Sequence, residues 1–166
     1  MVRLGGGGAG RRGVTGSDRA PVVVAGTEQH TLPLRTLEQA VIVRNQILRW
    51  FRRAAQEPDA ARRRRARPFT IVGGGPTGVE FAGALAELIR GSFRKDYAHW
   101  TSARCGDPVE AMGTLLPGLP QRLRAYAAAR LRRMGVEVRL QAVVQQVTRD
   151  AVHLRDGTTV PTDTVV

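Results

Sequence analysis

Three glycines, Gly73, Gly75 and Gly78, follow a short segment of β-branched and aromatic residues and precede an alanine-rich segment with helical spacing. They satisfy the pattern G-x-G-x-x-G directly between a predicted strand and a predicted helix. In this pattern the first glycine permits a tight turn, the second lets a diphosphate approach the backbone, and the third lets the helix pack closely against the strand. The junction therefore predicts a binding site for the diphosphate of a dinucleotide.

Pro76 has no amide hydrogen, so Thr77 and Gly78 are the expected backbone donors at the positive end of the helix dipole. The alternative is that the glycines only make a tight turn. The strand before the turn, the proline at the helix start and the small side chains that follow favour the dinucleotide. We therefore assign six consecutive residues to cofactor binding: Gly73, Gly74, Gly75, Pro76, Thr77 and Gly78.

A dinucleotide fold also needs a second strand that ends in an acidic residue, which accepts hydrogen bonds from the adenosine ribose. Glu110 is the candidate, although it lies farther from the glycines than the typical ~20 residues. Its carboxylate would repel a ribose phosphate, which favours NAD(H) over NADP(H); the alternative is an exposed loop glutamate. Gly106, Asp107 and Pro108 disfavour a regular central strand, since proline removes a ladder hydrogen bond and a buried aspartate is an unpaired charge. We expect a local distortion around Glu110.

No other pattern in the sequence is typical of catalysis. Cys105 is the only cysteine, which excludes an internal disulfide and a metal cage built from cysteines of this chain. We interpret it as a structural thiol, because no base is evident near it. His30, His99 and His153 lie far apart and lack the spacing of metal ligands. We predict no catalytic residue and no metal site.

The formal net charge of +12 suggests a nucleic-acid partner at first sight. Lys95 is the only lysine, however, and the abundance of arginine, alanine and glycine is typical of GC-rich codons. The one dense run, Arg62 to Arg65, could meet phosphates or an acidic membrane surface, but a solvated connector is the simpler interpretation. We predict no nucleic-acid partner.

Length and composition predict one domain, because 166 residues bury a single core. Residues 1–26 are rich in glycine and arginine and are expected to be disordered, low-complexity chain. Residues 27–67 are expected to be a connecting segment with an amphipathic helix, and residues 68–166 the dinucleotide-binding domain. No apolar run is long enough to cross a bilayer or to act as a secretion signal, so we expect a cytoplasmic location.

Hydrophobic periodicity predicts an α/β fold, in which a Rossmann-like parallel sheet and an antiparallel β-meander follow a connecting helix. Thr36 and Gln39 have capping-box spacing at the start of this helix, and Pro58 ends it near Glu57. The apolar stripe of the helix leaves Trp50 mostly outside its buried face. The stripe consists of Leu37, Ala40, Val41, Ile47, Leu48, Phe51, Ala54 and Ala55.

Two further helices are predicted, one over residues 77–89 and one from Pro120 to a glycine cap at Gly135. Turn signals at 149–150 and 156–157 separate the strands of the meander. Strands are predicted over residues 69–72, 136–140, 143–147, 152–154 and 159–160, and the last four residues begin another.

The glycine turn and the segments after it resemble the nicotinamide-binding domain of two-dinucleotide flavoprotein reductases, in particular the type II NADH dehydrogenases. The resemblance covers Thr27 to Val166 and includes VGGGPTGVEFAGALAEL, VEAMGTLLPGLP, LRAYAAARLRRMGVEVRL and DGTTVPTDTVV, in the order usual for the family. It implies an enzyme in which NADH reduces FAD and FAD reduces a quinone, with this domain positioning the nicotinamide rather than supplying an acid or a base. It also implies that Glu80 lies near the nicotinamide; a solvated carboxylate favoured by the helix dipole is the alternative.

The family places FAD mainly on a separate glycine-rich domain, and no credible second fingerprint lies before Thr27. The family also continues past the position of Val166 into a flavin-contacting segment and a region that meets quinone and membrane. We therefore expect an NADH-binding fragment of a flavin-dependent NADH dehydrogenase, inactive alone, whose full-length relatives lie peripherally on the inner face of the membrane. The alternative is a non-enzymatic dinucleotide-binding or interaction module that needs a partner chain.

Overall fold

The computed structural model describes residues 24–59, 69–93, 107–109 and 115–166. The helices are α1 (Thr27–His30), α2 (Leu37–Gln56), α4 (Pro76–Leu88), the π-helical turn η1 (Ile89–Phe93) and α6 (Gln121–Arg133). The strands are β1 (Thr70–Val72), β2 (Asp107–Val109), β3 (Val144–Val147), β4 (Ala151–Leu154) and β5 (Thr159–Pro161). The predictions for residues 1–23, Arg62 to Arg65, His99, Cys105 and Glu110 lie outside the described residues.

Helix α2 begins where its sequence predicts. The Gln39 amide donates to Thr36 Oγ1 at 3.3 Å, and the Gln39 side chain accepts from the Thr36 amide at 3.2 Å. This reciprocal pair satisfies two amides that have no partner within the helix, and it confirms the capping box. The hydrogen bond from Thr36 also holds the pKa of the exposed Glu38 carboxyl below its usual value.

The buried face of α2 differs from the predicted stripe. Trp50, expected mostly outside, is 7% exposed, whereas Leu37 is 77% exposed. The Trp50 ring packs edge-on against Phe51 and Phe69, with ring centroids 5.2 and 5.6 Å away. Burying this aromatic group removes more apolar area from water than burying Leu37 would, so the helix turns its aromatic side inward. The buried residues of α2 are Val43, Ile47, Trp50, Phe51 and Ala54.

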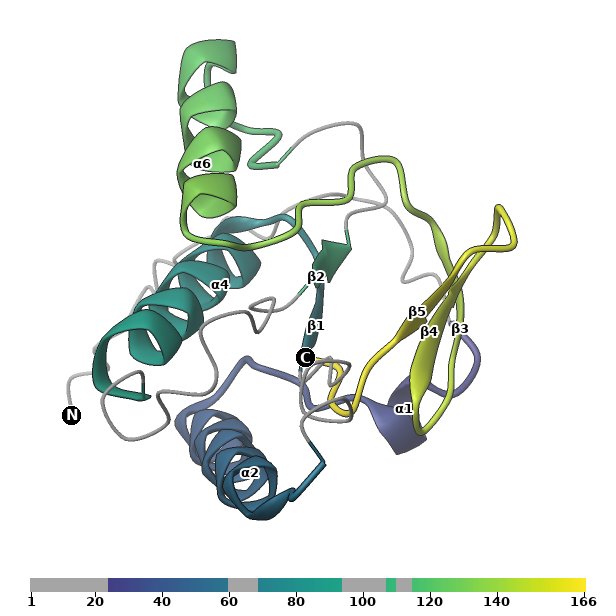
Figure 1. Cartoon of the computed structure of the whole chain (residues 1–166). Coiled ribbons are helices and arrows are strands. Elements are labelled where there is room, and N and C mark those ends of the chain that lie inside the picture. The colour runs from purple at the N-terminus through teal and green to yellow at the C-terminus, as the bar shows by residue number, and fades with distance from the viewer. Residues whose placement is uncertain (1–23, 60–68, 94–106, 110–114) are drawn as a thin grey trace, which may run out of the picture.

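Strand β1 lies within a set of parallel backbone segments near the C-terminus of the chain (Figure 1). It pairs with β2 on one side, with Ile71 opposite Pro108. On the other side the Val72 amide donates to the Val166 carbonyl at 2.8 Å, and the Val166 amide donates to the Thr70 carbonyl at 2.9 Å. The predicted final strand is therefore present as isolated parallel bridges, in which Val165 pairs with both Thr70 and Thr31.

Two strand predictions need correction. Asp107 and Pro108 were expected to prevent a regular strand, but both lie within β2 and in register with β1. A strand tolerates a proline where the proline nitrogen does not face the paired strand. Residues 136–140 do not form a strand, and only Arg139 takes part in a bridge. Val136 is nevertheless buried, and Val138 packs against the core. The alternating apolar pattern thus indicated burial correctly but not pairing.

The meander and helix α6 agree with the sequence. Strands β3, β4 and β5 pair antiparallel in that order, with turns at the predicted positions. After α6, the Gly135 amide donates to the Arg132 carbonyl and the Val136 amide to the Leu131 carbonyl, at 2.9 and 3.1 Å. Gly135 has a φ of 81°, the left-handed conformation that this helix ending requires.

The core consists of two apolar clusters. The larger one joins α2, β1, α4 and α6 around Phe51 and Phe69. The smaller one fills the meander and includes Val165 of the C-terminal segment. Residues 24–26, at the end of the segment expected to be disordered, also contact the meander, since Ala25 pairs with Gln146. Among the described residues, no helix is both long and apolar enough to cross a bilayer.

Candidate functional site

The glycine turn joins β1 to α4 as the sequence predicts. Gly73 leaves the strand with a φ of 124°, a conformation that residues with a side chain rarely adopt. Gly75 is the N-cap of α4, with a φ of −71° and a ψ of 178°. Pro76 is the first helical residue, where its fixed φ suits the helix and its missing amide costs no hydrogen bond. The backbone thus passes from strand to helix within three residues.

Gly78 brings the helix against the strand. A Cβ added to Gly78 would overlap the Gly73 carbonyl oxygen and would come within 3.6 Å of Ile71 Cγ2. Gly75 is different, because a Cβ there would meet no atom within 4 Å. Gly78 is therefore required by close packing within the protein, whereas the space above Gly75 is open.

The first turn of α4 leaves amide donors available. The Val79 amide donates to the Gly75 carbonyl at 3.0 Å. Pro76 has no amide hydrogen, so the first two amides of α4 are those of Thr77 and Gly78. Amides in the first turn of a helix have no acceptor within that helix. Two backbone donors therefore point out of the positive end of the helix dipole, next to the open space at Gly75.

Gly74 has a structural contact that the sequence did not suggest. Its carbonyl accepts a hydrogen bond of 2.8 Å from the Leu116 amide, and Gly74 is buried. Leu116 has a φ of 51°, so its own backbone is held in the left-handed region. This bond fixes the glycine turn to the segment before α6. A contact between residues so far apart in the sequence has no local sequence signal.

A cleft of about 410 Å³ opens beside the turn. Its walls come from the glycine turn, from the segment 31–35 that leads into α2, and from the C-terminal Val166. Val72, at the end of β1, lines the cleft and is 42% exposed, which is high for an apolar strand residue. The cleft places an apolar surface next to the two backbone donors.

Of the two acidic candidates, the structure describes only Glu80, and Glu80 does not line this cleft. Glu80 is the fifth residue of α4, one position beyond the first turn, and its side chain is exposed and does not line the cleft. Glu110 lies outside the described residues. The roles assigned to both remain predictions.

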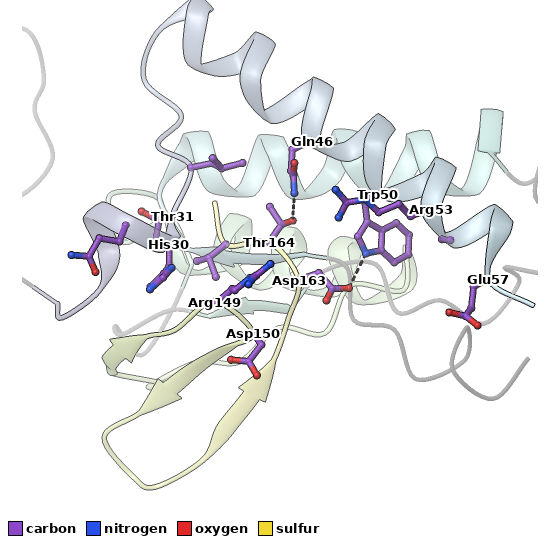
Figure 2. Close-up of a pocket in the computed structure, with 14 residues that line it drawn as sticks. His30, Thr31, Gln46, Trp50, Arg53, Glu57, Arg149, Asp150, Asp163 and Thr164 are labelled. Atoms are coloured by element: carbon purple, nitrogen blue, oxygen red, sulfur yellow. Dashed lines mark hydrogen bonds between the residues drawn. The ribbon is translucent and has the colours of Figure 1, made fainter. Parts of the chain in front are cut away.

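A larger and more polar cavity, of about 820 Å³, lies between α2, α1 and the meander (Figure 2). Two arginines and three carboxylates line it, so its charges do not favour an anionic diphosphate; they are Arg53, Arg149, Glu57, Asp150 and Asp163. The glycine turn is not part of its wall. Its size alone therefore does not make it the better candidate for a dinucleotide.

The polar contacts in this larger cavity hold the C-terminal segment in place. Trp50 Nε1 donates to Asp163 Oδ2 at 2.8 Å, and Gln46 Nε2 donates to Thr164 Oγ1 at 3.4 Å (Figure 2). Both contacts join α2 to the segment that runs beside β1. The connecting helix thereby supports the parallel segments that end at the cleft.

We expect the substitution Trp50→Phe to lower the free energy of unfolding by more than about 1 kcal/mol, because it removes a hydrogen bond to an exposed carboxylate and also leaves part of the space of a buried ring empty. Urea denaturation measures the loss. In a double-mutant cycle with Asp163→Ala, the coupling should be about 1 kcal/mol, the contribution of the hydrogen bond without the lost packing. Strictly additive effects would show that the Trp50–Asp163 contact contributes nothing.

Comparisons with known proteins agree with this geometry. Residues 14–166 match the family described as pyridine nucleotide-disulphide oxidoreductase. The chain is 36% identical over 125 residues to a type II NADH:quinone oxidoreductase of Mycobacterium tuberculosis, covering 75% of this chain and 27% of that protein. It is 34% identical over 140 residues to a mitochondrial internal alternative NAD(P)H-ubiquinone oxidoreductase of Solanum tuberosum, covering 83% and 28%.

Solved structures show the same fold at lower identity. NDH2 from Plasmodium falciparum, solved in complex with NADH, is 17% identical with a TM-score of 0.80, covering 89% of this chain and 31% of that chain. An NAD-dependent persulfide reductase from A. fulgidus is 20% identical with a TM-score of 0.62, covering 89% and 23%. The chain spans about a quarter of the length of the curated relatives described above.

Proposed function

Because the chain belongs to the pyridine nucleotide-disulphide oxidoreductase family, we propose that it is the NADH-binding part of a flavin-dependent NADH dehydrogenase. The observation that carries the proposal is the contrast between two glycines of one turn. Gly78 is required by contact with the Gly73 carbonyl, but the open space at Gly75 serves no packing purpose that the structure shows. Open backbone beside two amides that have no acceptor within their own helix is what a diphosphate needs.

Each residue of the turn has a role in this proposal. The amides of Thr77 and Gly78 donate to the phosphoryl oxygens, and Gly75 lets these oxygens reach the backbone. Gly73 and Gly74 hold the turn in shape, and Pro76 starts the helix. When bound, the nicotinamide supplies a hydride to an acceptor outside the described residues. The contribution of this chain is to hold the dinucleotide in position, and no acid or base of its own is needed.

We also propose that the parallel segments are the central part of a Rossmann-like sheet. The hydrogen bonds and bridges place Thr31, Val165, β1 and β2 side by side in one direction. In open parallel sheets, ligands bind beyond the carboxyl ends of the strands. The glycine turn lies at the carboxyl end of β1, which is where such a fold binds its dinucleotide.

The flavin and the quinone belong to the proposed longer protein rather than to the residues described. Those residues contain one glycine turn of this kind and therefore fit one dinucleotide, so we assign no FAD contact to them. The exposed Val72 and the cleft beside it suit contact with a flavin-binding portion. On this proposal the isolated chain binds NADH weakly and has little or no turnover. Its cytoplasmic location, with the full-length protein peripheral on the membrane, stays a prediction.

Titration with NADH, followed by nicotinamide fluorescence, tests the proposal. We expect the emission to change at nucleotide concentrations up to about 1 mM, the range of weak binding. NADPH should bind more weakly than NADH, because the proposed Glu110 carboxylate would repel the ribose phosphate. Unchanged emission with both nucleotides would contradict the proposal. Equal binding of both would contradict only the role of Glu110.

A second candidate is a non-enzymatic dinucleotide-binding module whose site is completed by a partner chain. The observation that favours it is the cleft beside the glycine turn, which is open and has the exposed Val72 in its wall. Co-purification from the source cells distinguishes the two. Recovery of a stable complex with a separate flavoprotein would favour the module, and recovery of the sequence only as part of a longer polypeptide would favour the fragment.

A further inference from the structure

The apolar stripe of helix α2 is wider than the face that the core buries. Leu37 and Val41 are 77% and 41% exposed, and Leu48 is half-buried. At 100° per residue, these three side chains fall within about 40° of the helix circumference, beside the buried face. This strip of α2, defined by Leu37, Val41 and Leu48, has no part in the proposed dinucleotide site.

A groove of about 220 Å³ lies beside the strip, between α2 and α4. Its walls include Ile47 and Leu48 of α2 and Phe81, Leu85 and Leu88 of α4. Leu88, at the end of α4, is 36% exposed and extends the apolar surface onto the rim. The volume is below the ~300 Å³ of pockets that hold small molecules. The α2–α4 groove therefore suits inserted side chains better than a free ligand.

The charges around this surface are positive. Arg44 is the only charged side chain among the described residues that line the groove. On the circumference of α2, Arg44 and Arg52 lie about 20° to either side of the strip. Glu38, the only acidic residue of α2, lies farther round, beyond Arg52. A partner with carboxylates on both sides of an apolar face therefore complements this surface.

The fold holds both walls of the groove in place. The capping box at Thr36 fixes the start of α2, and the hydrogen bond from Trp50 to Asp163 anchors its second half. The close contact at Gly78 fixes α4 against β1. A partner can therefore meet a preformed surface without ordering either helix first.

We propose that the α2–α4 groove and the strip beside it dock an acidic amphipathic helix of a partner protein. Such a helix inserts apolar side chains from one face into a groove between two helices. Its leucine-type residues lie in the groove and over the strip, and its carboxylates lie opposite Arg44 and Arg52. The inference does not rest on the proposed function, because the groove can be occupied with or without a nucleotide.

A helix fits this surface better than a bilayer or a nucleic acid does. A bilayer would contact the protruding Leu37 but could not reach Leu85, which lies inside the groove and is buried. Phosphate backbones attract arginine but make no use of apolar walls. An inserted helix uses both the recessed apolar walls and the cations on the rim.

Fluorescence anisotropy with a designed peptide tests the proposal on the full chain. The probe is a labelled peptide of about twenty residues, long enough to form a helix. It has leucine at positions i, i+3, i+4 and i+7, glutamate on both sides of this face, and alanine elsewhere. We expect saturable binding that salt weakens, and binding at least about ten-fold weaker when lysine replaces every glutamate.

A charge reversal tests whether the peptide lies beside Arg44. The substitution Arg44→Glu should weaken binding of the glutamate peptide about five-fold and strengthen binding of the lysine peptide by a similar factor. The matched control is Arg49→Glu, which changes the net charge equally but lies about 140° away around α2. It should change neither affinity by more than about two-fold.

A second pair of variants tests the apolar contact. Leu88→Ser should weaken binding of the glutamate peptide about five-fold, because less apolar area is buried on docking. Its control is Leu123→Ser on α6, which is similarly exposed at 43% and should leave the affinity unchanged. Both leucines are partly exposed, so the fold should be retained, as circular dichroism would show.

Three outcomes would overturn the proposal. The first is equal binding of the glutamate and lysine peptides, or equal losses in each variant and its control. The second is a dimer in analytical ultracentrifugation that Leu88→Ser dissociates, since a second copy would then occupy the groove. The third is full displacement of the peptide by phosphatidylglycerol vesicles or duplex DNA.

Discussion

The substitution Gly75→Leu should abolish NADH binding and leave the stability of the protein almost unchanged. Gly75 has a φ of −71°, which any residue adopts, and a Cβ there meets no protein atom within 4 Å. The leucine side chain would instead occupy the space proposed for the diphosphate. Two hydrogen bonds from backbone amides to charged oxygens would be lost, at about 1.5 kcal/mol or more each, which corresponds to over 100-fold in affinity.

The matched control for this experiment is Gly118→Leu. Like Gly75, Gly118 has open space at its Cβ, but it lies away from the cleft. Thermal unfolding of both variants should resemble that of the natural chain, and only Gly75→Leu should lose the fluorescence response to NADH. If Gly75→Leu still bound NADH, the dinucleotide would not lie over this turn and the proposed function would fail.

The second large effect concerns stability. The substitution Gly78→Ala should lower the free energy of unfolding by about 3 kcal/mol, because the added Cβ overlaps a backbone carbonyl that has no flexible side chain to yield. For a protein of this size, the melting temperature should fall by about 6–12 °C. The intrinsic preference of a helix for alanine over glycine, about 1 kcal/mol, acts in the opposite direction and is smaller than the clash.

Gly83→Ala on the same helix is the control for this preference. Gly83 lies inside α4, and a Cβ there meets nothing within 4 Å. Its replacement should therefore raise stability by about 0.5–1 kcal/mol. Differential scanning calorimetry of the two variants gives the sign of each effect. A Gly78→Ala variant as stable as Gly83→Ala would mean that α4 does not lie as close to β1 as the structure indicates.

Local signals identified the parts of the fold that are determined within a few residues. The capping box at Thr36, the glycine cap at Gly135 and the turn from β1 into α4 all lie where the sequence predicts them. In each, the residue type itself supplies the needed hydrogen bond or backbone angle. The packing role of Gly78 could also be predicted, because its place in the glycine pattern implies contact between helix and strand.

Periodicity was less informative where two faces of a helix compete for burial. The stripe predicted for α2 contained Leu37 but not Trp50, and the structure reverses the two. The choice depends on Phe69, which belongs to another segment and packs edge-on against Trp50. Similarly, the pattern in residues 136–140 indicated burial, but a strand also requires a neighbour to pair with, and no local pattern specifies one.

The sequence by itself determined that a glycine turn joins a strand to a helix, because Gly73 supplies a backbone angle that few other residues adopt and Gly78 permits close contact with the residue five positions before it. The tertiary structure alone decided what surrounds the turn: the bond from Leu116 to the Gly74 carbonyl, the C-terminal segment beside β1, and the cleft between them. These features join segments far apart in the chain. Their positions depend on the packing of the whole core, which no single stretch of residues encodes.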